Sequence, residues 1–105
     1  MRLTSYLQDG ILTIALTGEI DHHCAKEYIG AITAKIEAYS PRTSILDFRE
    51  VTFMDSSGIA VVINALRYMK QSGGELQVSG LHKQPYKVFR ASGIDKLVPM
   101  KELVV

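Results

Sequence analysis

The chain has 105 residues, of which 47% are hydrophobic and 22% are charged. This length is typical of a single domain, and the composition is that of a globular rather than a disordered protein. With 12 basic and 11 acidic residues, the formal net charge of +1 argues against bulk electrostatic attraction to nucleic acid or anionic lipid. The single cysteine excludes an intramolecular disulfide and a cysteine-rich zinc site.

Nothing in the sequence indicates export or membrane insertion. The first ten residues lack the apolar region of a signal peptide. The longest apolar stretch, Gly58 to Leu66, is far shorter than the ~20 residues that a membrane-spanning helix needs. We therefore predict a cytoplasmic protein without a membrane partner, folded as a single domain over residues 1–105.

The first part of the chain predicts a β-hairpin followed by a helix. Apolar alternation from Arg2 to Leu7 and the aliphatic run Ile11–Leu16 flank Asp9-Gly10, a dipeptide typical of a hairpin turn. Asp21 is a candidate N-cap for a helix that runs to about Tyr39.

The second part predicts strands that alternate with helices. Ser44–Phe48 and Glu75–Ser79 have the composition of strands, and Lys83–Ala91 that of a helix. Ile94–Pro99 is expected to be a last short strand or extended piece. The helix between the two strands is predicted to bury one stripe of apolar residues: Ile59, Val62, Ile63, Leu66 and Met69.

These elements predict an α/β fold with the order β-β-α-β-α-β-α-β. Strands separated by helices form a mostly parallel sheet with helices packed against it, and the opening hairpin makes that sheet mixed. We expect about four or five strands. Functional residues of such sheets usually lie in strand-to-helix loops, and two of these loops are chemically unusual here.

The first unusual loop is Asp55-Ser56-Ser57-Gly58, where a helix begins. One interpretation is capping, in which Asp55 or Ser56 accepts hydrogen bonds from amides of the first turn and stabilises the helix by about 1 kcal/mol. The other is a phosphorylation switch. A phosphate there would meet unpaired amides and the positive end of the helix dipole, and would add roughly −1.5 to −2 charges.

The second unusual loop, Gly18 to Cys24, contains Asp21, His22 and His23. A metal site is disfavoured because consecutive helical residues project about 100° apart and do not converge on one ion. A nucleophilic Cys24 activated by a neighbouring histidine is equally weak, since sequence neighbours need not be within reach. The plain alternative is a helix start with one histidine exposed and the other half-buried.

Signatures of enzymes are otherwise absent from the sequence. There is no G-x-S-x-G elbow, no G-x-G-x-x-G and no Walker A sequence. An aspartate adjacent in sequence to Ser56 does not orient a histidine, so a Ser-His-Asp triad is disfavoured as well. We predict a protein that is not an enzyme and that needs no cofactor or metal.

At these two loops the sequence resembles the anti-sigma-factor antagonists of bacteria, single-domain members of the STAS family. The resemblance covers essentially the whole chain and is closest to sporulation-type antagonists. It rests on four segments in the same order: Leu16–His23 (LTGEIDHH), Phe53–Ile59 (FMDSSGI), Gly73–Leu76 (GGEL) and Phe89–Ile94 (FRASGI).

This resemblance implies a mechanism. The unphosphorylated protein binds an anti-sigma factor that is also a serine kinase and so releases the sigma factor. The kinase then phosphorylates the first serine of D-S-S-G, here Ser56, and a serine phosphatase reverses the modification. By carry-over, the partner-binding residues are Asp21, His22, His23, Asp55, Ser57 and Gly58.

The same resemblance implies that the chain is a substrate rather than a catalyst, with no direct contact to nucleic acid. A monomer is favoured over a dimer. A second hypothesis keeps the fold but changes the role, because STAS domains also serve as interaction or ligand-sensing modules that have no sigma-factor partner.

Overall fold

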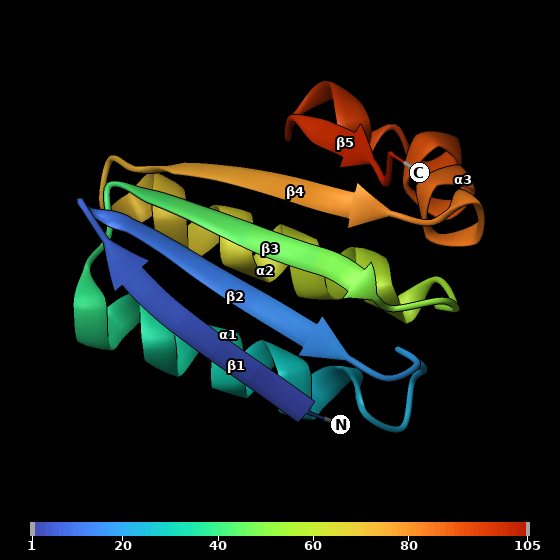
Figure 1. Ribbon diagram of the computed structural model, residues 1–105, viewed down its shortest axis with the longest axis horizontal. Coiled ribbons are helices and arrows are strands. Elements are labelled where there is room, and N and C mark those ends of the chain that lie inside the picture. The colour runs from blue at the N-terminus through green and yellow to red at the C-terminus, as the bar shows by residue number, and fades with distance from the viewer. Residues whose placement is uncertain (1, 105) are drawn as a thin grey trace.

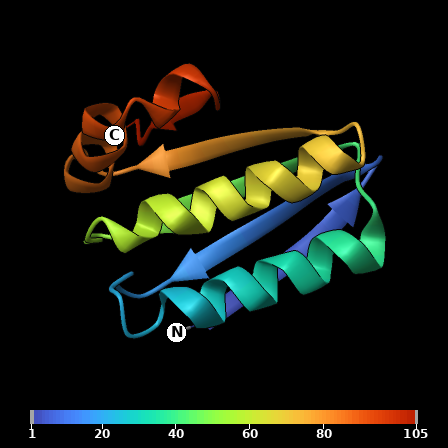
Figure 2. The same cartoon turned by 180° about the vertical axis from the view of Figure 1, so that it is seen from behind.

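The computed structural model describes residues 2–104 and has a five-stranded sheet with two long helices on one face (Figures 1 and 2). The residues at the limits of the predicted domain, 1 and 105, lie outside this range. The elements are β1 (Arg2–Gln8), β2 (Ile11–Thr17), α1 (Ala25–Tyr39), β3 (Thr43–Glu50), α2 (Ser57–Gln71), β4 (Glu75–Leu81), α3 (Lys83–Ser92), the 3-10 helix η1 (Ile94–Lys96) and β5 (Met100–Glu102).

The strands lie side by side in the order β1-β2-β3-β4-β5. β1 pairs with β2 antiparallel, and every later pair is parallel. The predicted fold class and element order are confirmed. The hairpin turn also lies where the sequence predicts it, because Asp9 and Gly10 both take the positive φ of a two-residue turn, 54° and 79°.

The core lies between the sheet and the long helices. β2 alternates strictly, so that Leu12, Ile14 and Leu16 are fully buried, and Ile14 is in register with Leu46 of β3. Helix α1 contributes Tyr28, Ile32 and Ile36 to the same layer. Because β2, β3 and β4 run in one direction, their carboxyl ends meet at one end of the molecule (Figure 1).

The buried stripe of α2 differs from the predicted one. Ile63 is 39% exposed, so its predicted burial is wrong, and the stripe is made of Gly58, Val61, Val62, Ala65 and Met69. This helix packs against both the sheet and α1, and small residues provide the close contact. The predicted burial of Val62 and Met69 is confirmed, and Ile59 and Leu66 pack partly buried against the core. Gly58 and Ala65 carry little hydrophobic signal, so an apolar pattern alone misses them.

The sequence predicts a last short strand or extended piece over Ile94–Pro99, but this segment begins as the 3-10 helix η1. Leu97 and Val98 both donate backbone hydrogen bonds to the carbonyl of Ile94, at 2.9 and 3.0 Å. Ile94 and Val98 are buried while Leu97 is exposed, which is the spacing of a helical turn. The last strand is therefore Met100–Glu102.

Candidate functional site

The two unusual loops meet at the carboxyl end of the parallel strands. Ile20, after β2, and Met54, after β3, form an isolated parallel bridge beyond the sheet. Ile20 donates its amide to the carbonyl of Phe53 at 3.1 Å and accepts the amide of Asp55 at 3.0 Å. Backbone hydrogen bonds therefore hold the two predicted site loops side by side.

Asp55 organises the start of α2. Its Oδ1 accepts hydrogen bonds from both the amide of Ser57, at 2.9 Å, and the hydroxyl of Ser57. Ser56 occupies the N-cap position, yet its side chain makes no capping hydrogen bond, and the residue is exposed. Of the two capping candidates, Asp55 is thus the one that acts, and the two adjacent serines differ: the hydroxyl of Ser57 bonds to Asp55, whereas Ser56 is exposed and its hydroxyl makes no capping bond.

The first amides of α2 are already bonded. Gly58 donates to the carbonyl of Asp55 and Ile59 to that of Ser56, both at 3.1 Å. The predicted set of unpaired amides at this helix start is therefore wrong, because Asp55 and the tight first turn satisfy them. What remains for an anion at Ser56 is the positive end of the helix dipole.

Asp21 plays a similar part in the other loop, but not as the N-cap of α1. Its Oδ1 accepts the amides of His23, at 2.9 Å, and Cys24, at 3.1 Å, and so caps a turn that precedes the helix. The predicted N-cap is three residues too early, because α1 begins at Ala25 with Cys24 in the N-cap position. The thiol of Cys24 donates to the carbonyl of Glu19 at 3.2 Å.

His22 connects the two loops through the side chain of Asp55. The amide of His22 donates to Oδ2 of Asp55 at 3.2 Å, and its Nδ1 lies 3.8 Å from the same oxygen. The rings of His22 and His23 stand 3.9 Å apart. Both histidines are exposed, with 72% of the His22 side chain accessible, so the expectation that one is half-buried is wrong.

Both loop carboxylates are stabilised in their charged form. Hydrogen bonds from Ser57 lower the pKa of Asp55, and nearby His22 lowers it further. Hydrogen bonding by Cys24 is the main cause that lowers the pKa of Asp21. At neutral pH these loops therefore carry two ionised carboxylates, Asp21 and Asp55, beside the rings of His22 and His23.

Gly58 lies beneath this surface. It is buried, and a Cβ at this position would stand 2.8 Å from Sδ and Cε of Met54. Its absent side chain lets α2 approach the buried Met54, so packing is the first role of this glycine. Its predicted contact with a partner stays a prediction.

Gln84 of α3 is a site residue that the sequence does not reveal. Its Nε2 donates to the carbonyl of Met54 at 2.8 Å, and its Oε1 accepts the amide of Met54 at 2.9 Å. One side-chain amide thus holds both backbone groups of the residue just before Asp55. No local pattern marks this glutamine, because its partner is 30 residues away in the chain.

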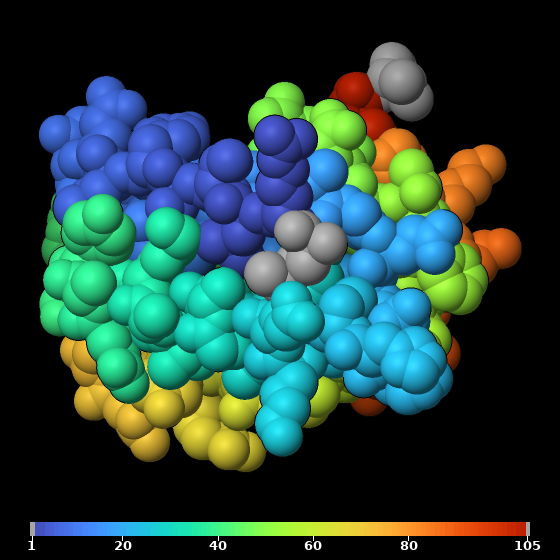
Figure 3. Space-filling model, turned by 90° about the horizontal axis from the view of Figure 1, so that it is seen from below, coloured from blue at the N-terminus to red at the C-terminus, as the bar shows by residue number. Residues whose placement is uncertain are grey.

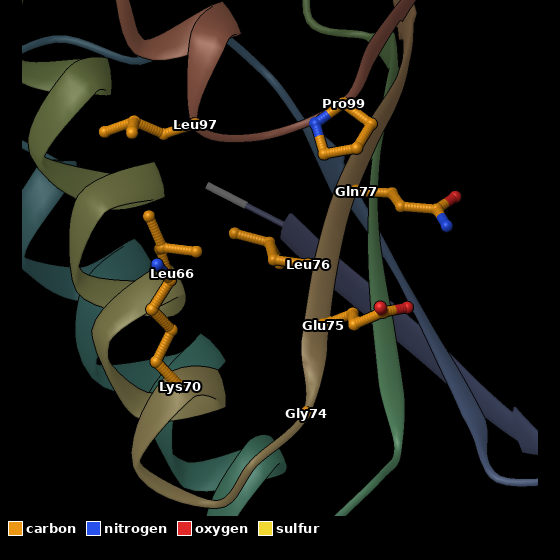
Figure 4. A pocket seen from close by; sticks show the side chains of 8 residues that line it. All are labelled: Leu66, Lys70, Gly74, Glu75, Leu76, Gln77, Leu97 and Pro99. Carbon is orange, nitrogen blue, oxygen red and sulfur yellow. The ribbon is translucent and has the colours of Figure 1, made fainter.

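A hollow of about 230 Å³ lies elsewhere, between α2 and β4 (Figure 4). In Figure 4, Leu66, Leu76 and Leu97 point into it, while Glu75 and Gln77 point to the other side of β4. Gly74 and Glu75, at the beginning of β4, also line it. The hollow therefore lies toward the amino-terminal end of β4, away from the loops around Ser56.

Residues 2–104 carry neither a candidate metal cluster nor a membrane-spanning helix. In that range no three His, Cys, Asp or Glu side chains are grouped so that they could hold a metal ion. None of the helices described there has the length and apolar character to cross a membrane.

The comparisons with known proteins agree on one family. The STAS domain family matches residues 2–104. The anti-sigma F factor antagonist of Lysinibacillus sphaericus is 31% identical over 83 residues, covering 79% of this chain and 71% of that protein. The anti-sigma F factor antagonist of Paenibacillus polymyxa is 29% identical over 91 residues, covering 87% of this chain and 78% of that protein.

Solved structures agree with these relatives. The anti-sigma factor antagonist SpoIIAA in its unphosphorylated form superimposes with a TM-score of 0.79 at 26% identity, covering 94% of this chain and 87% of that one. The Bacillus cell fate determinant SpoIIAA in the phosphorylated form gives a TM-score of 0.70 at 26% identity, covering 94% and 90%.

Proposed function

The chain belongs to the STAS domain family, and we propose that it is an anti-sigma factor antagonist switched by phosphorylation of Ser56. In the unmodified state it binds an anti-sigma factor that is also a serine kinase, which frees the sigma factor. The kinase phosphorylates Ser56 and ends the interaction, and a serine phosphatase restores it. One observation carries the proposal: Ser56 is an exposed residue whose hydroxyl makes no capping bond, whereas the hydroxyl of Ser57 is held by Asp55.

In the proposed reaction the chain supplies the nucleophile, and the kinase supplies ATP and the base. The Oγ of Ser56 attacks the γ-phosphorus of ATP, ADP leaves, and the hydroxyl proton passes to a base on the kinase. Asp55 is a poor base for this step, because its Oδ1 is occupied by Ser57 and its pKa is lowered. ATP therefore belongs to the partner, and the chain needs no cofactor of its own.

Phosphate on Ser56 is expected to leave the fold intact. The group is added to an exposed side chain at the positive end of the α2 dipole, where negative charge is favourable. The loop itself is held by backbone hydrogen bonds to Ile20 and by Gln84, none of which uses the Ser56 hydroxyl.

The same phosphate is expected to abolish docking. It places a group of roughly −2 charge beside Asp55, on the surface that a partner would cover. An unpaired charge at the centre of an interface costs several kcal/mol in binding. This asymmetry between fold and interface is what a binding switch requires.

The proposed partner-binding surface surrounds Ser56 and mixes polar and apolar groups. His22, His23 and Asp55 are joined by the contacts described above, and Asp21 lies in the same loop as the histidines. Phe53 adds an aromatic side chain that is 44% exposed. Aromatic anchors within a polar rim are typical of protein interfaces.

The experiment uses the anti-sigma factor encoded in the same genome, Mg-ATP and the purified chain, followed by mass spectrometry of proteolytic peptides. We expect phosphate on Ser56 in the unmutated chain and in Ser57→Ala. Ser56→Ala should bind the anti-sigma factor and remain unmodified. Phosphate on Ser57 alone, or no phosphate in the presence of binding, would reject the assignment.

The hollow of Figure 4 favours a second candidate, a STAS module that senses a small ligand. Leu66, Leu76 and Leu97 offer apolar contact, and Lys70 adds a cation to the lining. Calorimetry of the isolated chain with nucleotides and small organic anions separates the two candidates. Tight binding that is lost in Leu76→Trp, which fills the hollow, would favour the sensor.

A further inference from the structure

Helix α3 carries a row of cations that the proposed switch does not use. Lys83, Lys87 and Arg90 follow the spacing i, i+4, i+7, which places them along one face of the helix, and all three are exposed. The guanidinium of Arg90 lies over the ring of Tyr86, 5.7 Å from its centroid. Together with Tyr86 we call these residues the α3 basic face.

The charges of the basic face have no ion-pair partner within the part of the chain that the structure describes. Over residues 2–104, Arg49 pairs with Asp47, and Nδ1 of His22 lies 3.8 Å from Oδ2 of Asp55; neither contact involves α3. α3 itself contains no acidic residue, and the acidic residue that lines the shallow groove on the basic face is Glu102. The row is therefore available to anionic groups from outside the molecule.

The beginning of α3 lies next to the loop that presents Ser56. Gln84, the residue after Lys83, holds the backbone of Met54, which is two residues before Ser56. Figure 3 shows segments from the two site loops and from the beginning of α3 at the same end of the molecule, coloured blue, yellow-green and orange. A protein large enough to cover Ser56 would therefore extend onto α3.

We propose that the α3 basic face is a second docking surface, which binds an acidic segment of the same anti-sigma factor that covers Ser56. This inference rests on the proposed function. Arg90 suits bidentate pairing with a carboxylate, and the two lysines act as point charges next to it. Because the basic face lies outside the Ser56 loop, its main effect is to steer the encounter and raise the association rate.

An acidic protein segment fits this surface better than a nucleic acid. The row of cations extends over only about 10 Å, seven residues at the rise of an α-helix. The neighbouring carboxylates of Asp55 and Glu102 would repel a phosphate backbone, and the formal net charge of the whole chain is only +1. A protein partner can instead place its own cations opposite these acids.

The test compares two charge reversals of equal size. Lys83→Glu/Lys87→Glu alters the basic face, and Lys35→Glu/Arg67→Glu makes the same change in net charge on α1 and α2. Association with the anti-sigma factor is followed by stopped-flow at low salt and again near 0.5 M salt. We expect the first variant to associate about tenfold more slowly at low salt, with the difference vanishing at high salt, and the control to stay within about twofold.

Equal slowing by both variants would overturn the docking surface while leaving the proposed function in place. If the unmutated chain fails to bind the anti-sigma factor, the proposed function fails, and a second measurement decides the inference. Amide shifts are then recorded by NMR with a glutamate-rich peptide and, separately, with a short DNA duplex. Shifts confined to α3 with the peptide support the inference; no shifts with the peptide, or tighter binding of the duplex, overturn it.

Discussion

The two ends of the sheet are held together in different ways. At the end that contains the hairpin turn, the backbone provides the connections: Arg42 donates its amide to Gly10, and Glu75 donates its amide to Arg42, both at 2.9 Å. At the other end, the backbone bonds of Ile20 are supplemented by side chains: Asp55 accepts the amide of His22, and Gln84 bonds both backbone groups of Met54. The first end tolerates little change in shape, whereas the second exposes polar groups and a free hydroxyl.

This difference predicts which substitutions affect stability and which affect binding. Backbone bonds closed by glycine turns leave little for a partner to recognise. Side-chain bonds leave carboxylate and imidazole atoms at the surface, where a partner or a kinase can contact them. Substitutions at the hairpin end should therefore change the free energy of unfolding, and substitutions around Ser56 should change binding.

The strongest test of this separation is Ser56→Asp. We expect affinity for the anti-sigma factor to fall about a hundredfold, or about 2.7 kcal/mol. The free energy of unfolding should change by less than about 0.5 kcal/mol, because an acid is favourable at a helix N-terminus. Calorimetric binding and urea unfolding measure the two quantities. Ser56→Asn, of the same shape but uncharged, is the control, and an equal loss of binding in it would show that bulk rather than charge is responsible.

Gly74→Ala should produce the opposite pattern. A Cβ at Gly74 would lie 2.8 Å from the carbonyl oxygen of Arg42, which is backbone and cannot move aside. We expect a loss of about 2 kcal/mol in the free energy of unfolding, with binding by the folded protein unchanged. The control is Gly30→Ala, in helix α1, where the added Cβ would meet no neighbouring heavy atom within 4 Å. It should stabilise the protein by about 0.5–1 kcal/mol, and similar effects at both glycines would contradict this account.

Gln84→Ala tests the side-chain connection to the Ser56 loop. Loss of both hydrogen bonds to the buried Met54 should cost about 1–2 kcal/mol in the free energy of unfolding. Amide exchange should become faster at Met54 and Asp55 before it does so in the sheet. Gln71→Ala removes the same atoms from an exposed glutamine and should change neither quantity. Unchanged exchange in Gln84→Ala would mean that the loop is held by the bridge to Ile20 alone.

The smallest expected effect concerns the pKa of Asp55. Hydrogen bonds from Ser57 lower this pKa below 3.8, so Ser57→Ala should raise it toward that value. Because the pKa is lower in the folded state, the contribution of Asp55 to stability is present above about pH 4 and is lost as the pH falls through its folded pKa. NMR titration of the carboxyl carbon between about pH 2 and 6 measures this shift. An unchanged pKa in Ser57→Ala would assign the stabilisation to the backbone amides instead.

Local patterns in the sequence determined much of this protein. Alternation and helical spacing placed the hairpin, the first four strands and the three helices, because these patterns depend on near neighbours in the chain. The D-S-S-G and G-E-I-D-H-H segments also indicated which loops to examine. Tertiary contacts decided the rest: that Ile20 pairs with Met54, that Asp55 accepts the amide of His22, and that Gln84 holds Met54. Each of these depends on groups brought together by the parallel sheet, and no local pattern encodes such a meeting.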